Sequence, residues 1–271
     1  MPDAITGLSA RFAVSQQRTM MVQKYHTAPL KIAKVFQFEP NQLAVYVMDS
    51  SPGIMAGDHY KLNWHLEEGA NVYITNQSFT KLHPSKNNPS TQTLNIWVGK
   101  HAVLEYFPEP VMPYKDSDFT SVNDVKLEQG GTIMMAEVLC PGRTFHGEVF
   151  EYHSYVNRLK VVYNDELIYY SSQKIKPSEQ KMKWLGSWED QTYLGNLMVF
   201  SDLLRPEHIV EIRNILESNQ MVYSGVSFTY KHGLLVSMLG SKAAEVQALI
   251  KLIWECLRRQ LLQLPPLLVR K

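Results

Sequence analysis

The stretch SPGIMAGDHYKLNWHLEEGANVYITNQSFTKLHPS, residues 51–85, decides the fold that we predict for this chain. It opens with a corner formed by Pro52, Gly53, Gly57 and Asp58. Glycine and proline at this density favour a tight, irregular turn that presents a carboxylate at its end. In residues 59–66, apolar and polar side chains then alternate at every position, which is the period of a half-buried β-strand. The stretch therefore predicts a corner followed by a strand.

Glycine turns recur along the first half of the chain. Gly69, Gly99 and Gly130 each separate a departing strand from a returning one, and they lie roughly thirty residues apart. This interval is typical of stacked or coiled repeats. We therefore expect a mainly β fold of stacked β-layers that resembles a short β-helix or sandwich. A simple meander with similar hairpin lengths stays open at this point.

Other segments before residue 200 also have the composition of strands. Residues 20–25 and 43–48 are β-prone, and Pro29 and Pro40 should break the linker between them into short extended pieces. Residues 148–163 are dense in aromatic and β-branched side chains without a breaker, which predicts one long or bent strand.

The pattern changes after residue 200. Pro206 stands where a first helical residue is expected, and a hairpin with its turn at Lys231 to Gly233 separates two segments with one-sided apolar faces. The residues of these faces are Ile209, Ile212, Ile215 and Leu216, and then Val246, Leu249, Ile250, Ile253, Leu257 and Leu261. We predict a β-layer domain over residues 1–200. Two α-helices in a small C-terminal α+β module, residues 201–271, should pack on it as one structural unit.

The overall composition limits the classes of partner. The chain has 271 residues, of which 27 are basic and 26 acidic, so the formal net charge of +1 creates no global field for nucleic acid or an anionic membrane. Cys140 and Cys256 are far apart and form no metal-binding spacing, as expected in a reducing compartment. Neither a signal peptide nor a membrane-spanning apolar run is visible. We expect a cytoplasmic protein.

Local motifs for catalysis are absent from the sequence: we find no Walker loop, nucleophile elbow, dinucleotide fingerprint or HExxH. His59 and His65 share one strand face, but six extended residues separate them by about 20 Å, which is too far for one metal ion. We expect no stably bound metal and interpret both histidines as surface residues.

Glu137 is the most informative charged residue, since it is the one charge in the apolar segment TIMMAEVL. A carboxylate among buried positions requires a partner or an aqueous channel. One interpretation is a structural salt bridge that braces the nearby CPGR corner, with Arg143 and Glu148 in the same network. The other is a polar interior route or hard-ligand site for a divalent ion, with Asp58 as a further candidate.

Several segments, taken in order, match a known family. The stretch SPGIMAGDHYKLNWHLEEGANVYITNQSFTKLH resembles the signature of urease accessory proteins of the UreD type, with its SPG corner, GD pair, G-A turn and TxQxxxK strand end. The likeness continues through LEYFPEPVMPYKDSDF, AEVLCPGRTFHGEVF, NDELIYY and WECLRRQLLQLPP. No single piece is specific, but the ordered set covers nearly the whole chain.

The resemblance implies a non-enzymatic maturation chaperone. Such proteins bind the urease apoprotein and, with UreF and with UreG through UreF, help to install a di-nickel centre; transient nickel in an internal polar tunnel is the expected cargo, with no cofactor. The family's route residues fall on Asp58, Glu137, Arg143 and Glu148, and its structural positions on Pro52, Gly53, Gly57, Gly69 and Gly142. Two points differ: Ile54 stands where many relatives have a second glycine, and some relatives have Asp at position 137.

Two other functions stay open. One is a carbohydrate hydrolase or lyase on a β-solenoid, with Asp58, Glu137 or Glu148 as acid and base. The other is a docking scaffold without an ion route. In either accessory function we expect partner surfaces on the C-terminal helices and the apolar tail, residues 261–269, since such a tail is hard to bury in a monomer.

Overall fold

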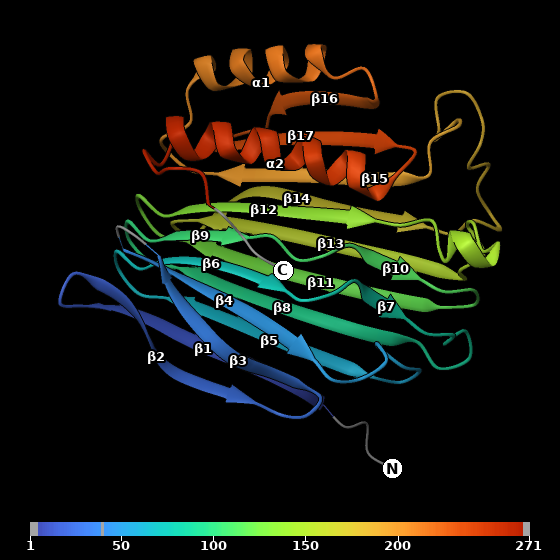
Figure 1. Ribbon diagram of the computed structural model, residues 1–271, viewed down its shortest axis with the longest axis horizontal. Coiled ribbons are helices and arrows are strands. Elements are labelled where there is room, and N and C mark those ends of the chain that lie inside the picture. The colour runs from blue at the N-terminus through green and yellow to red at the C-terminus, as the bar shows by residue number, and fades with distance from the viewer. Residues whose placement is uncertain (1–4, 39–40, 268–271) are drawn as a thin grey trace.

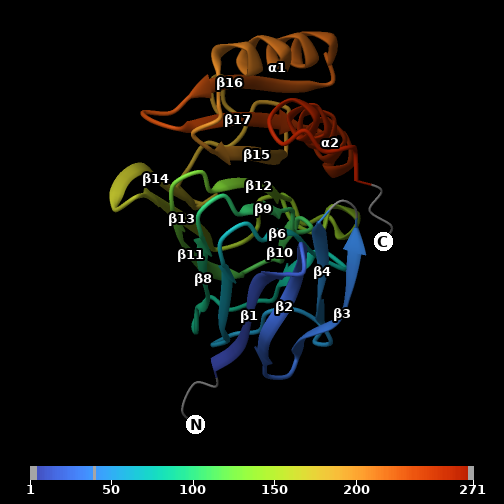
Figure 2. The ribbon, with the colours of Figure 1, turned by 90° about the vertical axis from the view of Figure 1, so that its left-hand side faces the viewer.

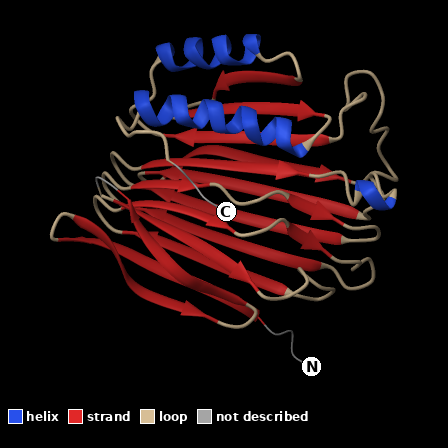
Figure 3. Ribbon diagram, in the orientation of Figure 1, coloured by secondary structure: helices blue, strands red, loops and turns tan. Residues whose placement is uncertain are grey.

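Two facing β-sheets form the body of the protein, and two helices cover one of them (Figures 1 and 3). The computed structural model describes residues 5–38 and 41–267. The seven-stranded sheet has the order β14-β13-β11-β8-β5-β1-β2. Its strands are β1 (Ile5–Ser15), β2 (Arg18–His26), β5 (His59–Leu66), β8 (Ser90–Val98), β11 (Asp118–Leu127), β13 (Ser154–Tyr163) and β14 (Glu166–Ile175).

The ten-stranded sheet has the order β16-β17-β15-β12-β9-β6-β4-β3, and off this path β10 pairs with β12 and β7 pairs with β10. Its strands are β3 (Leu30–Phe38), β4 (Gln42–Asp49), β6 (Asn71–Asn76), β7 (Thr80–Leu82), β9 (Val103–Tyr106), β10 (Val111–Pro113), β12 (Thr132–Leu139), β15 (Tyr193–Phe200), β16 (Val222–Phe228) and β17 (Gly233–Gly240). The helices are α1 (Pro206–Ser218) and α2 (Ala243–Gln260), and a 3₁₀ turn, η1, spans Thr144–His146. No described helix has the length and apolar character needed to cross a membrane.

The stacked layers predicted from the glycine spacing are present. β5, β8, β11 and β13 pair in parallel in one sheet, and β6, β9 and β12 pair in parallel in the other. The turns between them also stack, since Gly69 N donates to Lys100 O at 2.9 Å and Gly99 N donates to Leu66 O at 2.8 Å. A meander would pair neighbouring strands antiparallel, so the chain instead winds in coils that pass from one sheet to the other (Figure 2).

One strand was not predicted, and two local predictions were wrong. Residues 5–15 form β1, for which the sequence analysis gave no strand. The linker expected to consist of short pieces contains the nine-residue strand β3, an edge strand with an irregularity between Ile32 and Val35, where a break in pairing is tolerated. Pro29 precedes this strand, and Pro40 lies outside the described residues. The strand expected over residues 148–163 begins at Ser154, because the preceding residues form a loop in which Phe150 has a φ of +59°.

The C-terminal elements agree with the sequence patterns. α1 begins at Pro206, the two predicted apolar faces are largely buried, and β16 and β17 form the predicted hairpin. Both helices contact strands of the ten-stranded sheet, among them β15 and β16. β15, which ends at Phe200, pairs with β12 on one side and β17 on the other, so this sheet continues across residue 200.

Apolar side chains fill two layers. One lies between the sheets and includes Phe12, Trp64 and Phe200, all fully buried. The other lies between the ten-stranded sheet and the helices and includes Met134, Ile212 and Ile253. Burial of apolar surface at roughly 25 cal/mol per Å² makes these two layers the main stabilising contribution.

A buried ion pair ties α2 to the ten-stranded sheet. Arg258 is 1% exposed and Glu105 on β9 is 0% exposed, and they form a salt bridge. Trp254 Nε1 donates to Glu105 Oε2 at 2.6 Å, and Gln42 Nε2 donates to Glu105 Oε1 at 2.8 Å. Arg258 Nε also donates to Pro265 O at 2.8 Å, so the same side chain holds the segment after the helix.

Removal of the cation should destabilise the fold strongly. We expect Arg258→Met to lower the free energy of unfolding by about 3–5 kcal/mol, because Glu105 would be left charged and buried without its partner. Urea denaturation monitored by tryptophan fluorescence measures this. Lys242→Met, at the N-cap of the same helix, is the matched control, since its surface pair with Glu245 contributes below about 1 kcal/mol. Equal losses in the two variants would contradict this account of the ion pair.

Candidate functional site

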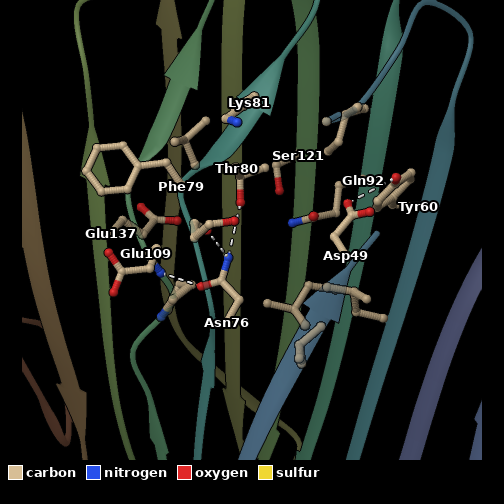
Figure 4. Close-up of a pocket in the computed structure, with 18 of the residues that line it drawn as sticks. Asp49, Tyr60, Asn76, Phe79, Thr80, Lys81, Gln92, Glu109, Ser121 and Glu137 are labelled. Atoms are coloured by element: carbon tan, nitrogen blue, oxygen red, sulfur yellow. Dashed lines mark hydrogen bonds between the residues drawn. The ribbon is translucent and has the colours of Figure 1, made fainter. Parts of the chain in front are cut away.

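A polar cavity lies between the two sheets (Figure 4). Its volume is about 140 Å³, and its lining combines buried side chains such as Leu94 and Met135 with surface residues of the turn over residues 77–81. One water molecule needs about 10–15 Å³, so the cavity has room for several. The cavity therefore joins the interior of the sandwich to the surface.

One wall of the cavity is a row of polar side chains that crosses the seven-stranded sheet. Tyr60 on β5 pairs in register with Gln92 on β8, Gln92 with Ser121 on β11, and Ser121 with Asn157 on β13. All four side chains line the cavity. Residues in register on adjacent strands point to the same face, so these four form a continuous polar row perpendicular to the strands.

Glu137 stands at the β13 end of this row, on β12 of the opposite sheet. Asn157 Nδ2 donates to Glu137 Oε1 at 2.6 Å, and Asn123 Nδ2 donates to Asn157 Oδ1 at 2.7 Å. Ser121 Oγ donates to Asn123 Oδ1 at 3.3 Å, which extends the chain of hydrogen bonds. Figure 4 shows Glu137 beside Phe79 and Glu109, with Gln92, Asp49 and Tyr60 at the other side of the cavity.

The environment of Glu137 is unusual for a carboxylate. Every other residue of β12 is buried, whereas Glu137 is partly accessible because it faces the cavity. Desolvation raises the pKa of Glu137, and the hydrogen bond from Asn157 opposes this in part. No described salt bridge includes it. Glu137 is therefore a carboxylate held by neutral partners and open to the cavity.

Other polar groups of the wall have few protein partners. Trp64 lines the cavity, and its Nε1 is buried without a protein acceptor, which favours water nearby. Burial raises the pKa of Tyr155, and the nearby Glu137 raises it further. Desolvation also raises the pKa of Tyr60 to about 12, and its hydroxyl donates to Asp49 Oδ2 at 3.3 Å.

The surface end of the cavity lies beside α2. Asn76 Nδ2 donates to Ser78 O at 2.9 Å, and Asn76 Oδ1 accepts from Glu109 N at 2.5 Å. Gln247 on α2 donates to Glu109 Oε2 at 3.3 Å. The mouth is thus held by hydrogen bonds between a turn, the segment after β9 and the C-terminal helix.

Asp58 does not line the cavity around Glu137. Its Oδ2 accepts from Met55 N at 2.8 Å and its backbone N donates to Met55 O at 3.1 Å, so the carboxylate closes the corner before β5. Its backbone O accepts from Thr91 N at 2.9 Å and links the corner to the next coil. The structure therefore places Asp58 as a turn residue.

Arg143 and Glu148 bind each other and not Glu137. Arg143 Nε donates to Glu148 Oε2 at 2.8 Å, and the guanidinium lies 4.2 Å from the ring centre of Tyr114. The hydrogen bond from Arg143 lowers the pKa of Glu148. A salt bridge does brace the CPGR corner, as one interpretation of the sequence proposed, but Glu137 is not part of it.

The remaining motif positions shape turns. At Gly53 (φ +143°) a Cβ would lie 2.5 Å from Lys81 O, and at Gly142 (φ +136°) a Cβ would lie 2.6 Å from Glu148 O, so neither site accepts a side chain. Gly57 lies in the corner with Asp58, and Gly69 lies in the stacked turn before β6. The carbonyl of Pro52 lies 3.2 Å from Nε2 of His83.

The described residues contain no group of three His, Cys, Asp or Glu side chains arranged to hold a metal ion. His59 and His65 lie on the outer face of β5, where His65 packs against Trp97. Cys140 and Cys256 are buried free thiols, and burial raises the pKa of Cys140 to about 12. The oxygen-rich cavity offers carboxylate, amide and hydroxyl groups, which suit hydrated divalent cations.

The C-terminal tail is partly satisfied within the chain. Leu261 and Leu267 are each 6% exposed and join the layer beneath the helices. Leu268 and Val269, which belong to the apolar tail considered as a partner surface, lie outside the described residues. Burial of the first part of the tail weakens the reason for expecting a partner there.

Sequence reasoning missed the polar row. Gln92, Ser121 and Asn157 each occupy an inward position of a strand whose other inward residues are mostly apolar. Such breaks in alternation are a visible signal, but their alignment depends on registers of 29 and 36 residues between strands. These offsets follow from the pairs Ser121↔Gln92 and Asn157↔Ser121.

Fold and site together define a mainly β protein of stacked parallel coils with a polar interior cavity. The chain matches the family model described as UreD urease accessory protein over residues 6–271, and it belongs to this family. It is 32% identical over 247 residues to urease accessory protein UreD of Acetivibrio thermocellus, covering 91% of this chain and 94% of that protein. It is 27% identical over 248 residues to UreD of Sporosarcina pasteurii, covering 90% and 96%.

Glu137 should make stability depend on pH in a defined direction. Its raised pKa means that the native state holds the proton more tightly than the unfolded chain, whose Glu pKa is about 4.3. The stabilisation from this proton is present below that value and is lost as pH rises through the native pKa. We expect the wild type to lose more stability than Glu137→Gln as the pH rises above about 4.3.

Urea denaturation at a series of pH values measures this difference. Gln at position 137 keeps an oxygen that can accept from Asn157, so the variant removes the titratable group and retains this hydrogen bond. Glu217→Gln, at an exposed position of α1, is the control and should follow the wild type. Parallel pH profiles for wild type and Glu137→Gln would show that Glu137 does not titrate in this way.

Proposed function

We propose that this protein is a urease maturation chaperone, not an enzyme, and that it acts in the cytoplasm. It binds the urease apoprotein together with UreF, and with UreG through UreF, and it supports delivery of nickel to the di-nickel active site. Membership of the UreD family and its relatives' names as urease accessory proteins support the maturation role. The binding of UreF, UreG and the apoprotein and the delivery of nickel are further parts of the proposal, beyond the maturation role.

The observation that supports a nickel route is the row of polar side chains that leads to Glu137. The neutral oxygens of this row contact a divalent cation, directly or through water, without holding it tightly. Glu137 supplies a negative charge inside the cavity. A cation that must move on requires weak ligands in series, as in other conduction paths. Nickel is therefore the proposed transient cargo, and a resident metal or cofactor is not part of the proposal.

The positions of Asp58, Arg143 and Glu148 exclude these three residues from the proposed nickel route. Asp58 closes a corner, and Arg143 and Glu148 neutralise each other at another. We therefore assign the route to Glu137 with Gln92, Ser121 and Asn157, and we assign the other three residues a structural role.

The carbohydrate hydrolase alternative receives less support. Such an enzyme needs two carboxyl groups within about 5–9.5 Å of each other across a substrate cleft. Of Asp58, Glu137 and Glu148, Glu137 alone lines the cavity, and the other two have separate partners. Asp49 and Glu109 also line the cavity, and each accepts a hydrogen bond from a neighbouring side chain, Tyr60 and Gln247 respectively. The arrangement favours an accessory function.

Deletion of the gene in a urease-positive host tests the maturation role. We expect urease protein to be present at its usual level but poor in nickel and inactive, because the apoprotein would lack its accessory complex. Immunoblotting, metal analysis and urease assays of the same extract measure the three quantities. Full urease activity in the deletion strain would refute the proposed function.

The route is tested by complementing that strain with variants. We expect Glu137→Gln to lower the nickel content of urease several-fold while assembly with UreF is retained, because the end of the polar row loses its carboxylate. Asn157→Leu should act in the same direction by interrupting the polar row. Metal analysis of purified urease measures both effects, and co-purification measures assembly.

Two controls separate a route from a scaffold. Glu217→Gln should leave nickel loading unchanged. Asp58→Ala should reduce the amount of folded protein by opening the corner, but not the nickel delivered per assembled complex. Normal nickel loading with both Glu137→Gln and Asn157→Leu would leave a docking scaffold as the function.

A further inference from the structure

The outer face of the seven-stranded sheet is the large uncovered surface of the described chain. The main helix contacts are with the ten-stranded sheet, and β8, β11 and β13 lie on the side away from α2 (Figure 2). Outward side chains on this face stand in register across the strands. The outward side chains of this face therefore form rows that cross the strands.

Basic side chains outnumber acidic ones in three adjacent rows of this face. The rows comprise Gly7, Lys61, Thr93, Val122 and Arg158; Ser9, Asn63, Asn95, Asp124 and Lys160; and Arg11, His65, Trp97, Lys126 and Val162. Lys61, Lys126, Arg158 and Lys160 are exposed, and we call these four residues the basic face. Arg11 is paired with Glu67. Within these rows Asp124 is the single acidic side chain.

An aromatic anchor lies among these charges. Trp97 is 41% exposed and its ring lies 3.9 Å from that of His65, at a hollow of about 410 Å³. Asn95 Nδ2 donates to Asn63 Oδ1 at 2.8 Å and fixes the floor of this hollow. Exposed Trp, Tyr and Arg side chains are the residues that contribute most to protein interfaces.

The charges of the basic face favour one class of binding partner over others. A second copy of this chain bound through the same face would bring the basic face against itself, which is unfavourable. The formal net charge of +1 gives no global attraction for nucleic acid. A protein with an acidic surface has the complementary charge, and an extended sheet face matches a large partner.

We propose that the basic face, with Trp97 as its apolar anchor, binds an acidic surface of the urease apoprotein. This inference rests on the proposed function and names the surface through which it operates. The contact lies on the opposite side of the sandwich from the helices, so it leaves α2 and the cavity mouth accessible to other components.

Charge reversal tests the surface. Lys126→Glu, Arg158→Glu and Lys160→Glu are combined in one full-length variant, and binding to purified urease apoprotein is measured at about 50 mM and 300 mM salt. We expect wild-type affinity to fall with salt and the variant to bind at least about tenfold more weakly at low salt. The control combines Lys31→Glu, Lys183→Glu and Arg213→Glu, which make the same charge change at exposed positions elsewhere, and should bind within about twofold of wild type.

A second variant keeps the test valid where the charge-reversed protein folds poorly. Trp97→Ala keeps every charge and should weaken apoprotein binding by about tenfold. If both variants bind the apoprotein with wild-type affinity, the basic face is not the binding surface, and the proposed function is left intact. Absence of apoprotein binding by the wild type would overturn both. Binding of a single-stranded oligonucleotide, or self-association, through the basic face with urease binding unchanged would also overturn the proposal.

Discussion

The register between stacked coils is the constraint on which the rest of the structure depends. Thr91 pairs with His59 on one side and Thr120 on the other, and the same offsets persist along the parallel strands. Because a parallel ladder keeps equivalent side chains on one face, a polar residue in one coil is aligned with a polar residue in the next. The inward row from Tyr60 to Asn157 and the outward basic face arise from this one alignment. A slip by one residue would exchange the two faces.

The two internal carboxylates of Glu105 and Glu137 have different electrostatic surroundings. Glu105 is sealed beneath α2 with Arg258, Trp254 and Gln42 as partners, so its charge is neutralised and serves to hold the helix. Glu137 has an amide partner and a cavity, so its charge is neither neutralised nor sealed. The first arrangement is suited to structure and the second to an exchanging ligand, since an unpaired carboxylate in a low-dielectric setting attracts protons and cations.

The two sheets have different outward environments. The ten-stranded sheet is covered by helices and by the beginning of the tail, and the cavity mouth lies beside this cover at Gln247. The seven-stranded sheet exposes polar, basic and aromatic side chains. A protein organised in this way presents separate surfaces around one interior cavity, which suits an accessory protein.

Some features of this protein were determined by local sequence. Alternation located β5, glycine spacing indicated the stacked coils, and helical periodicity with Pro206 defined α1 and α2. These signals depend on residues within one element, so they are readable without a partner. The single charge in TIMMAEVL marked Glu137 for the same reason. Tertiary structure alone decided that Asn157 binds Glu137, that Asp58 and the Arg143–Glu148 pair do not contact Glu137, and that β1 and β3 join the sheets. Those outcomes depend on the register between strands and on where the outer strands join the sheets. The glycine spacing indicated that the coils stack, but it records neither of these.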